Sequence, residues 1–148
     1  MNEIDVIRKI VKAKKTKLNI FVEDPFGPRY KMNLCYYKLC FFLEEGTNKV
    51  VYKDGNGNSV PMTTPTFHTY LNMNRPSVNN VVFKLRKEGV LMKVTVYSKS
   101  CYYMNPNYAF NGDNIPYFLL KLFERDDELV YNENKFNIKE IDETDCST

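Results

Sequence analysis

Few side chains in this sequence are suited to catalysis. His68 is the only histidine, and the four cysteines are Cys35, Cys40, Cys101 and Cys146. A Cys–His nucleophile pair would need one of these thiols to approach His68 in space, together with a third group that orients the imidazole ring. An enzyme centred on His68 is therefore one hypothesis, and a structural or exposed histidine is the alternative.

Metal and phosphate chemistry has even less support. One histidine cannot form a two-histidine metal site, and no cysteine pair has the CxxC spacing of a zinc or redox centre. The phosphate-binding patterns GxxxxGK(S/T) and GxGxxG and the nucleophile pattern GxSxG are missing. The acidic cluster at residues 126–128 lacks the spacing of a calcium loop. We therefore expect no catalytic residue, no metal and no small-molecule cofactor.

Positive charge is concentrated near the start of the chain. Six of the ten residues 8–17 are basic: Arg8, Lys9, Lys12, Lys14, Lys15 and Lys17. Three interpretations compete: a segment that contacts nucleic-acid phosphates, an import signal similar to Lys-Lys-x-Lys, and the solvated face of a helix. Arg75 and Lys84, and more strongly Arg86 and Lys87, are further candidates for phosphate contact.

Tyrosines near lysines are candidates for a binding surface. Tyr97, Tyr102 and Tyr103 lie close to Lys99 in the sequence. Exposed rings can stack on unpaired bases while lysines follow the phosphates, and exposed tyrosines also make broad contacts with protein partners. The alternative is that these rings pack across neighbouring strands of a sheet.

The two parts of the chain differ in charge. Residues 1–104 carry 17 basic and 8 acidic side chains, a balance of +9, whereas residues 105–148 carry 4 and 10, a balance of −6; together they give the net charge of +3. Opposite charges on two surfaces favour head-to-tail self-association. The alternative is that the acidic tail covers the chain's own basic surface.

The composition indicates a folded protein inside the cell. A chain of 148 residues with 43% hydrophobic and 26% charged residues has the size and composition of one globular domain. It has no apolar run long enough to span a membrane, no secretory signal at its start and no cysteine framework, so we expect the cytoplasm or the nucleus. The richness in Asn, Lys, Tyr and Phe resembles accessory or structural proteins of large DNA viruses with AT-rich genomes.

The first half of the chain reads as one helix followed by strands. Apolar residues at helical spacing predict a helix within residues 1–13, centred on 4–11. Residues 17–22 alternate as a strand does, and a turn cluster follows. Residues 30–43 are predicted as a strand that becomes doubly buried, with a helix over 36–45 as the alternative.

Later segments are dominated by turn signals. Asp-Gly and Asn-Gly between residues 50–52 and 60–62 predict a β-hairpin. A second hairpin is predicted from residues 81–87 and 90–98 around Glu88-Gly89, and residues 66–70 read as a strand or its edge. Residues 116–124 suit a short helix or a buried strand. Tail strands are predicted at 128–131 and 135–138.

These elements predict a mostly β domain spanning residues 1–148. We expect a β-sandwich or open barrel of about eight antiparallel strands over residues 17–139, a short N-terminal helix, a further short helix at most, and a mobile acidic tail over 140–148. The favoured function is a non-enzymatic protein-binding or assembly module with a protein partner or a second copy of the chain. Single-stranded nucleic-acid binding through the basic N-terminal segment is the alternative, and an enzyme centred on His68 is the second alternative.

Overall fold

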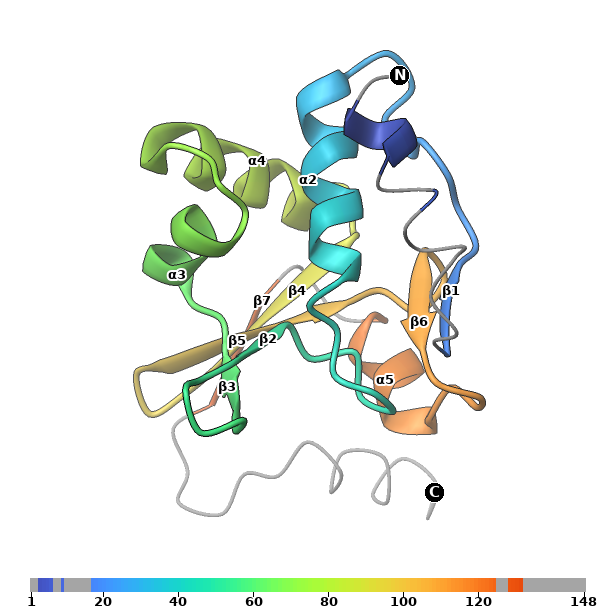
Figure 1. Ribbon diagram of the computed structural model, residues 1–148. Helices are drawn as coiled ribbons and strands as arrows, with labels where there is room; N and C mark the ends of the chain where they lie inside the picture. Colours follow the sequence, from blue (N-terminus) through green and yellow to red (C-terminus); the bar gives the residue numbers. More distant parts are fainter. Residues whose placement is uncertain (1–2, 7–8, 10–16, 125–127, 132–148) are drawn as a thin grey trace.

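The computed structural model describes residues 3–6, 9, 17–124 and 128–131. Helix accounts for 37% and strand for 24% of the chain, so the protein is mixed α/β and the prediction of a mostly β sandwich or open barrel is wrong. The helices are α2 (Tyr30–Cys40), α3 (Thr64–Tyr70), α4 (Arg75–Lys87) and α5 (Tyr117–Leu122), and residues 3–6 are also helical (Figure 1). The strands are β1 (Leu18–Ile20), β2 (Val51–Lys53), β3 (Ser59–Pro61), β4 (Leu91–Val96), β5 (Lys99–Met104), β6 (Ala109–Asn111) and β7 (Glu128–Tyr131).

The strands form small separate sheets. β1 pairs with β6 and β2 with β3, both antiparallel, while β4 lies between antiparallel β5 and parallel β7. Across the described ranges these sheets neither close into a barrel nor stack as a sandwich. Because no sheet is large enough to supply a core of its own, the helices provide much of the buried apolar surface.

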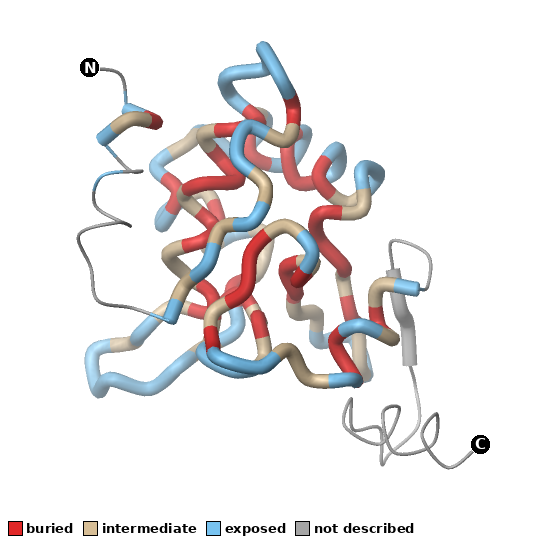
Figure 2. The backbone as a smooth tube through the Cα atoms, turned by 90° about the vertical axis from the view of Figure 1, so that its right-hand side faces the viewer, coloured by how far each residue is buried: buried red, intermediate tan, exposed pale blue. Residues whose placement is uncertain are grey.

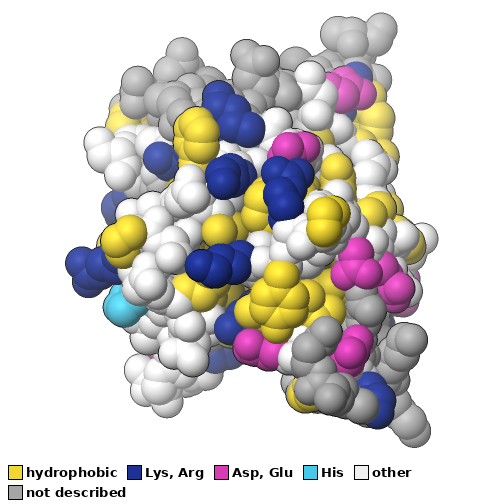
Figure 3. Space-filling view, turned by 90° about the horizontal axis from the view of Figure 1, so that it is seen from above, with side chains coloured by type: hydrophobic (Ala, Val, Ile, Leu, Met, Phe, Trp, Pro, Cys, Tyr) yellow, Lys and Arg dark blue, Asp and Glu magenta, His cyan; other side chains and the backbone are white. Residues whose placement is uncertain are grey.

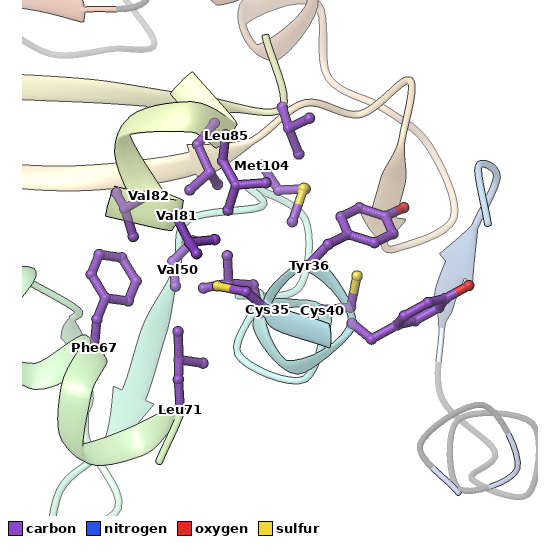
Figure 4. Packing of buried hydrophobic residues seen from close by; sticks show 14 of the residues in the cluster. Cys35, Tyr36, Cys40, Val50, Phe67, Leu71, Val81, Val82, Leu85 and Met104 are labelled. Atoms are coloured by element: carbon purple, nitrogen blue, oxygen red, sulfur yellow. The ribbon is translucent and has the colours of Figure 1, made fainter. Parts of the chain in front are cut away.

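The main core lies where α2, α3 and α4 meet the strands (Figure 4). Buried side chains from these elements include Cys35, Tyr36, Cys40, Val50, Phe67, Leu71, Val81, Val82, Leu85 and Met104. A second cluster packs α5 against β4, β5 and β6. Figure 2 shows that buried residues line the interior of the folded chain while the outer turns are exposed. The prediction of a single domain is compatible with this packing and stays a prediction.

Helix α2 replaces the strand predicted over residues 30–43. Most of its residues are buried, including both Tyr36 and Tyr37, so it lacks the polar stripe by which a surface helix is recognised. The buried Tyr36 hydroxyl lies 2.8 Å from the Val22 carbonyl oxygen and 2.9 Å from that of Tyr108, so it has acceptors in the interior. The alternative prediction over residues 36–45 had the right element type but placed it too late.

Helix α4 replaces the first strand of the hairpin predicted over residues 81–98. The Asn74 side chain accepts a hydrogen bond from the Ser77 N–H at the helix start, where Pro76 also fits without loss of a bond. Gly89 ends the helix with φ +76°, and its N–H bonds the Arg86 carbonyl while the Val90 N–H bonds that of Leu85. This pair of bonds is a Schellman motif, so Gly89 terminates a helix instead of turning a hairpin.

Other predicted elements have mixed outcomes. The strands at β1 and β7, the β2–β3 hairpin and a helix within residues 116–124 are confirmed. Residues 66–70 form most of helix α3 and not a strand; a reciprocal capping box between Thr63 and Thr66 starts that helix. Residues 3–6 and 9 are helical, as predicted. Three other predictions lie outside the described residues: the rest of the basic N-terminal segment up to residue 16, the strand at 135–138 and the acidic tail.

Asn48 connects three segments inside the protein. Its side chain is fully buried; the Nδ2 donates to the carbonyl oxygens of Met104 (3.1 Å) and Ala109 (2.7 Å), and the Oδ1 accepts from the Asn111 N–H (3.0 Å). Its φ of +60° lies in the left-handed region, which Asn tolerates better than most residues. Asn48 thereby attaches the loop before β2 to the end of β5 and to β6.

Candidate nucleic-acid interface

Helices α3 and α4 are joined by a turn of four residues, Leu71–Asn74. Leu71 is fully buried, and Asn72 takes a positive φ of +53° that reverses the chain. His68 Nδ1 lies 3.1 Å from the Met73 carbonyl oxygen, and the Met73 N–H donates to the His68 carbonyl. Two short helices joined by such a turn have the connectivity of a helix-turn-helix. His68 therefore holds the turn in place.

Lys38 connects the turn between α3 and α4 to helix α2 and to the N-terminal segment. Its ammonium group donates to the Leu71 carbonyl oxygen at 2.9 Å and lies 3.1 Å from a carboxylate oxygen of Glu3. The Lys38 side chain is only 16% exposed, so the contact is shielded from water. Helix α2 therefore positions the turn through the Lys38 side chain.

Helix α4 has one buried and one exposed face. Val78, Val81, Val82 and Leu85 are buried and face α2, α3 and β4. The opposite stripe, at spacings of three and four residues, is exposed and consists of Pro76, Asn80, Phe83 and Lys87. Arg75, Asn79 and Lys84 are exposed beside this stripe. We call these seven residues the α4 face.

The α4 face carries positive charge without acidic side chains. Helix α4 contains Arg75, Lys84, Arg86 and Lys87 and no Asp or Glu. The adjacent carboxylate, that of Glu88, lies 3.7 Å from the guanidinium of Arg29. In Figure 3 basic side chains spread over the left of the upper surface, where α3 and α4 lie in Figure 1, and over its centre, where α2 lies; acidic side chains gather mainly toward the right and the lower edge. This surface attracts anions.

An aromatic ring is exposed in the middle of this charged face. The Phe83 side chain is 53% exposed, and the Lys87 ammonium lies 5.4 Å from its ring centroid, within cation–π distance. Half of a phenyl ring in water gives no packing energy to the fold, so Phe83 is available for contact with a partner.

A β-hairpin follows helix α4 directly. β4 and β5 pair so that Val96 faces Lys99, and the two residues between them, Tyr97 and Ser98, have φ of +50° and +67°. Positive φ at both positions defines the type I′ turn that suits a right-twisted hairpin. The tip exposes the side chains of Tyr97, which is 43% exposed, and Lys99. In Figure 1 this tip and helices α3 and α4 lie on the same, left-hand side of the molecule.

Two contacts fix the hairpin relative to the helices. The Tyr102 ring packs edge-on against Phe67 of α3, with centroids 5.0 Å apart, and its hydroxyl lies 3.3 Å from that of Thr64. The Asn105 side chain donates to the Gly89 carbonyl oxygen (2.8 Å) at the end of α4. These contacts join the base of the hairpin to α3 and to the end of α4.

The predicted surface tyrosines have different positions. Tyr97 is exposed at the hairpin tip, but Tyr102 and Tyr103 are only 2% and 3% exposed, so they pack in the interior and form no binding surface. Successive side chains of a strand point to opposite faces of the sheet, so Tyr102 and Tyr103 lie on different faces. Helix α3 covers the face of Tyr102 and the α5 cluster covers the face of Tyr103, so both rings are buried. The prediction of a three-tyrosine surface is therefore wrong for two of its members.

The predicted basic residues are not all brought together. Lys87 belongs to the α4 face, and Arg86 lies half-buried beside it. Lys17 lies by β1, on the opposite side of the molecule in Figure 1, where its ammonium contacts Glu45 (3.2 Å) and Asp113 (3.1 Å). Lys9 is exposed; Arg8, Lys12, Lys14 and Lys15 lie outside the described residues.

Sequence reasoning missed the two asparagines and Phe83 of the α4 face, because it treated this segment as a strand.

The three cysteine thiols in the described part of the chain, those of Cys35, Cys40 and Cys101, are unsuited to nucleophilic catalysis. Burial raises the pKa of Cys35 from 9.0 to about 12, and burial likewise raises the pKa of Cys40 and Cys101. A nucleophilic cysteine needs a lowered pKa, because the thiolate is the reactive form. Cys35 and Cys40 belong to the core on α2, whereas His68 lies in the turn region of α3, and the described residues contain no cluster of three metal-binding side chains.

An open cavity of about 540 Å³ lies on the other side of α3, near β2. The Tyr52 and Tyr70 rings stack with centroids 4.5 Å apart, and Phe42 packs edge-on against Tyr70. Glu44, Glu45 and Lys53 also line it, so its charge is mixed. Mutual ring stacking accounts for these aromatic side chains without a ligand.

Comparison of the chain with protein-family models, with curated proteins and with solved structures finds no match. Among the described residues, no helix is both long and apolar enough to cross a membrane.

Proposed function

We propose that this protein binds double-stranded DNA by placing helix α4 in the major groove, with the β4–β5 hairpin against the neighbouring backbone. The observation that carries the proposal is the α4 face: the second helix of a helix-turn-helix exposes basic, amide and aromatic side chains and no carboxylate. In helix-turn-helix proteins the second helix reads the major groove.

The dimensions of the two partners are compatible. An α-helix with its side chains is about 10–12 Å wide. The major groove of B-DNA is about 12 Å wide, which admits one helix. Helix α4 contains 13 residues and therefore extends over roughly 20 Å, enough for its middle to face the bases while Lys84 and Lys87 reach phosphates.

The hairpin supports a duplex over a single strand. It follows helix α4 in the chain, as the wing follows the recognition helix in winged helix-turn-helix proteins, and its tip carries Tyr97 and Lys99. Lys99 is exposed beside the hairpin turn, and its positive charge favours contact with a second stretch of phosphates. Binding of single-stranded nucleic acid requires exposed aromatic rings along a groove. Of the three tyrosines predicted to stack on bases, Tyr102 and Tyr103 are buried, so only Tyr97 is exposed for that purpose.

Two earlier hypotheses have less structural support. A protein-binding or assembly module rested on a large adhesive sheet, which the three small sheets do not provide. Single-stranded binding through residues 8–17 rested on a segment of which only Lys9 and Lys17 are described, and Lys17 is engaged by two carboxylates. Both stay predictions that the next experiment can favour.

The test is a salt titration with the purified full-length chain. A labelled duplex of about 25 base pairs, roughly two helical turns, and each of its separate strands are compared by fluorescence anisotropy. We expect tighter binding to the duplex and a linear fall of log K with log salt, with a slope of about −3 to −5 for four or five phosphate contacts. Tighter binding to the single strands, or no binding at low salt, contradicts the proposal.

A further inference from the structure

Two adjacent asparagines occupy the middle of helix α4. Asn79 and Asn80 are both exposed, and Asn lowers helix stability relative to Ala because its amide competes for backbone hydrogen bonds. The described asparagines Asn33, Asn48, Asn74, Asn105 and Asn111 each bond the backbone through their side chains. Capping and turn formation do not explain Asn79 and Asn80, since they lie in the interior of the helix.

The amide groups have a specific partner in the major groove. A carboxamide donates to N7 and accepts from the N6 amino group of adenine with two hydrogen bonds, a pattern that no other base pair presents. An apolar side chain distinguishes thymine by contact with its C5 methyl group. The α4 face combines both elements, because Phe83 lies three residues after Asn80 on the same stripe.

The spacing of these residues matches neighbouring base pairs. Three residues of helix rise about 4.5 Å. Successive base pairs are about 3.4 Å apart along each strand. Asn80 and Phe83 can therefore contact base pairs one or two steps apart, while Arg75 and Lys84 at the flanks are placed for phosphates.

We propose that the α4 face reads A·T base pairs, with the Asn79 and Asn80 amides on adenine and the Phe83 ring on a thymine methyl group. This inference rests on the proposed duplex binding and adds its sequence preference. The target is a short run of two or three successive A·T pairs within a duplex, recognised from the major groove.

The test starts with selection of duplexes from a random pool by the full-length protein. We expect the selected sequences to share a core of A·T pairs. Replacing the core adenines by 7-deazaadenine removes the N7 acceptor and is expected to weaken binding about tenfold per lost bidentate contact. Replacing the core thymines by uracil removes the methyl group and is expected to weaken binding several-fold.

Variants connect each effect to its residue. The double variant Asn79→Ala with Asn80→Ala is expected to bind adenine and 7-deazaadenine duplexes equally, and Phe83→Ala to bind thymine and uracil duplexes equally. Both helix variants are expected to fold, because Ala is the better helix former. Asn114→Ala, at an exposed asparagine in the loop before α5, is the matched control and is expected to keep full discrimination.

The outcomes separate the two proposals. Salt-dependent duplex binding with no sequence preference, or a selected core of G·C pairs, overturns the A·T reading and leaves duplex binding intact. A 7-deazaadenine effect that persists unchanged in the double variant also overturns it. Absence of duplex binding by the wild-type chain overturns both.

Discussion

Reversing two charges on helix α4, Lys84→Glu together with Lys87→Glu, is expected to weaken duplex binding about 100-fold near 0.1 M salt, roughly tenfold for each side chain. Both lysines are exposed on the α4 face, where each carboxylate would repel the phosphates that the ammonium group attracts. The slope of log K against log salt should also fall in magnitude by about two, because two fewer phosphates are neutralised. Fluorescence anisotropy over a series of salt concentrations measures both quantities.

A control with the same change in net charge isolates the position of the charges. Lys53→Glu with Lys121→Glu places the substitutions on β2 and α5, outside helix α4. This control should lose only a few-fold in affinity through the long-range field. Carboxylates in the last turn of a helix oppose its dipole, so Lys84→Gln with Lys87→Gln is a milder second variant that keeps the helix. Equal losses in the α4 and control variants would contradict a localised interface.

Removing the Asn48 side chain is expected to cost the largest amount of stability. Asn48→Gly leaves the carbonyl oxygens of Met104 and Ala109 and the Asn111 N–H without their partner, at about 1–3 kcal/mol for each buried group. The total of roughly 3–9 kcal/mol is a large part of the 5–15 kcal/mol that typically stabilises a domain. Urea denaturation followed by circular dichroism measures the change in the free energy of unfolding.

Two further variants separate the hydrogen bonds from the backbone conformation. Asn48→Ala adds a left-handed penalty at φ +60°, so it should be less stable than Asn48→Gly by about 1 kcal/mol. Asn107→Ala, at an exposed asparagine in the turn between β5 and β6, should stay within about 0.5 kcal/mol of the wild type. A loss under 1 kcal/mol in Asn48→Gly would mean that the amide does not hold these three segments together.

The elements predicted correctly from the sequence are those with strong local signals. Asp54-Gly55-Asn56-Gly57 forces a reversal, and the β2–β3 hairpin forms around it. Strand β1 alternates apolar and polar residues, and it pairs with β6 as an edge strand does. Such patterns depend on neighbours in the chain, so tertiary packing does not override them.

Helices α2 and α4 were predicted as strands because their sequences fit both kinds of element. Helix α4 buries Val78, Val81, Val82 and Leu85, a valid i, i+3, i+4, i+7 pattern, but its β-branched residues and the alternation of residues 81–87 also fit a strand. The decisive signals were at its ends: Asn74 with Pro76 at the start, and basic residues before Gly89 at the finish. Helix α2 lacks even these, because the protein surrounds it on most sides.

The candidate site was predictable only in part. Positive charge at Arg86 and Lys87 was visible in the sequence, and both lie on or beside the α4 face. The asparagines and Phe83 were missed, because their shared face exists only if the segment is helical. Thr63–Thr66 and Asn74–Ser77 are both helix-start signals, and they are far enough apart for one short helix and a turn. Recognising both signals would have predicted two helices joined by a short turn.

The most direct measurement of the central claim is a map of the protein surface that contacts DNA. In nuclear magnetic resonance spectra of the isotope-labelled full-length chain, titration with the duplex should shift the amide signals of residues 75–87 and of the hairpin tip at 97–99 most strongly. The stacked tyrosines Tyr52, on β2, and Tyr70, at the end of α3, should change less. Shifts concentrated at those tyrosines or on residues 8–17, with the α4 signals unmoved, would contradict the assignment of helix α4 as the element that binds DNA.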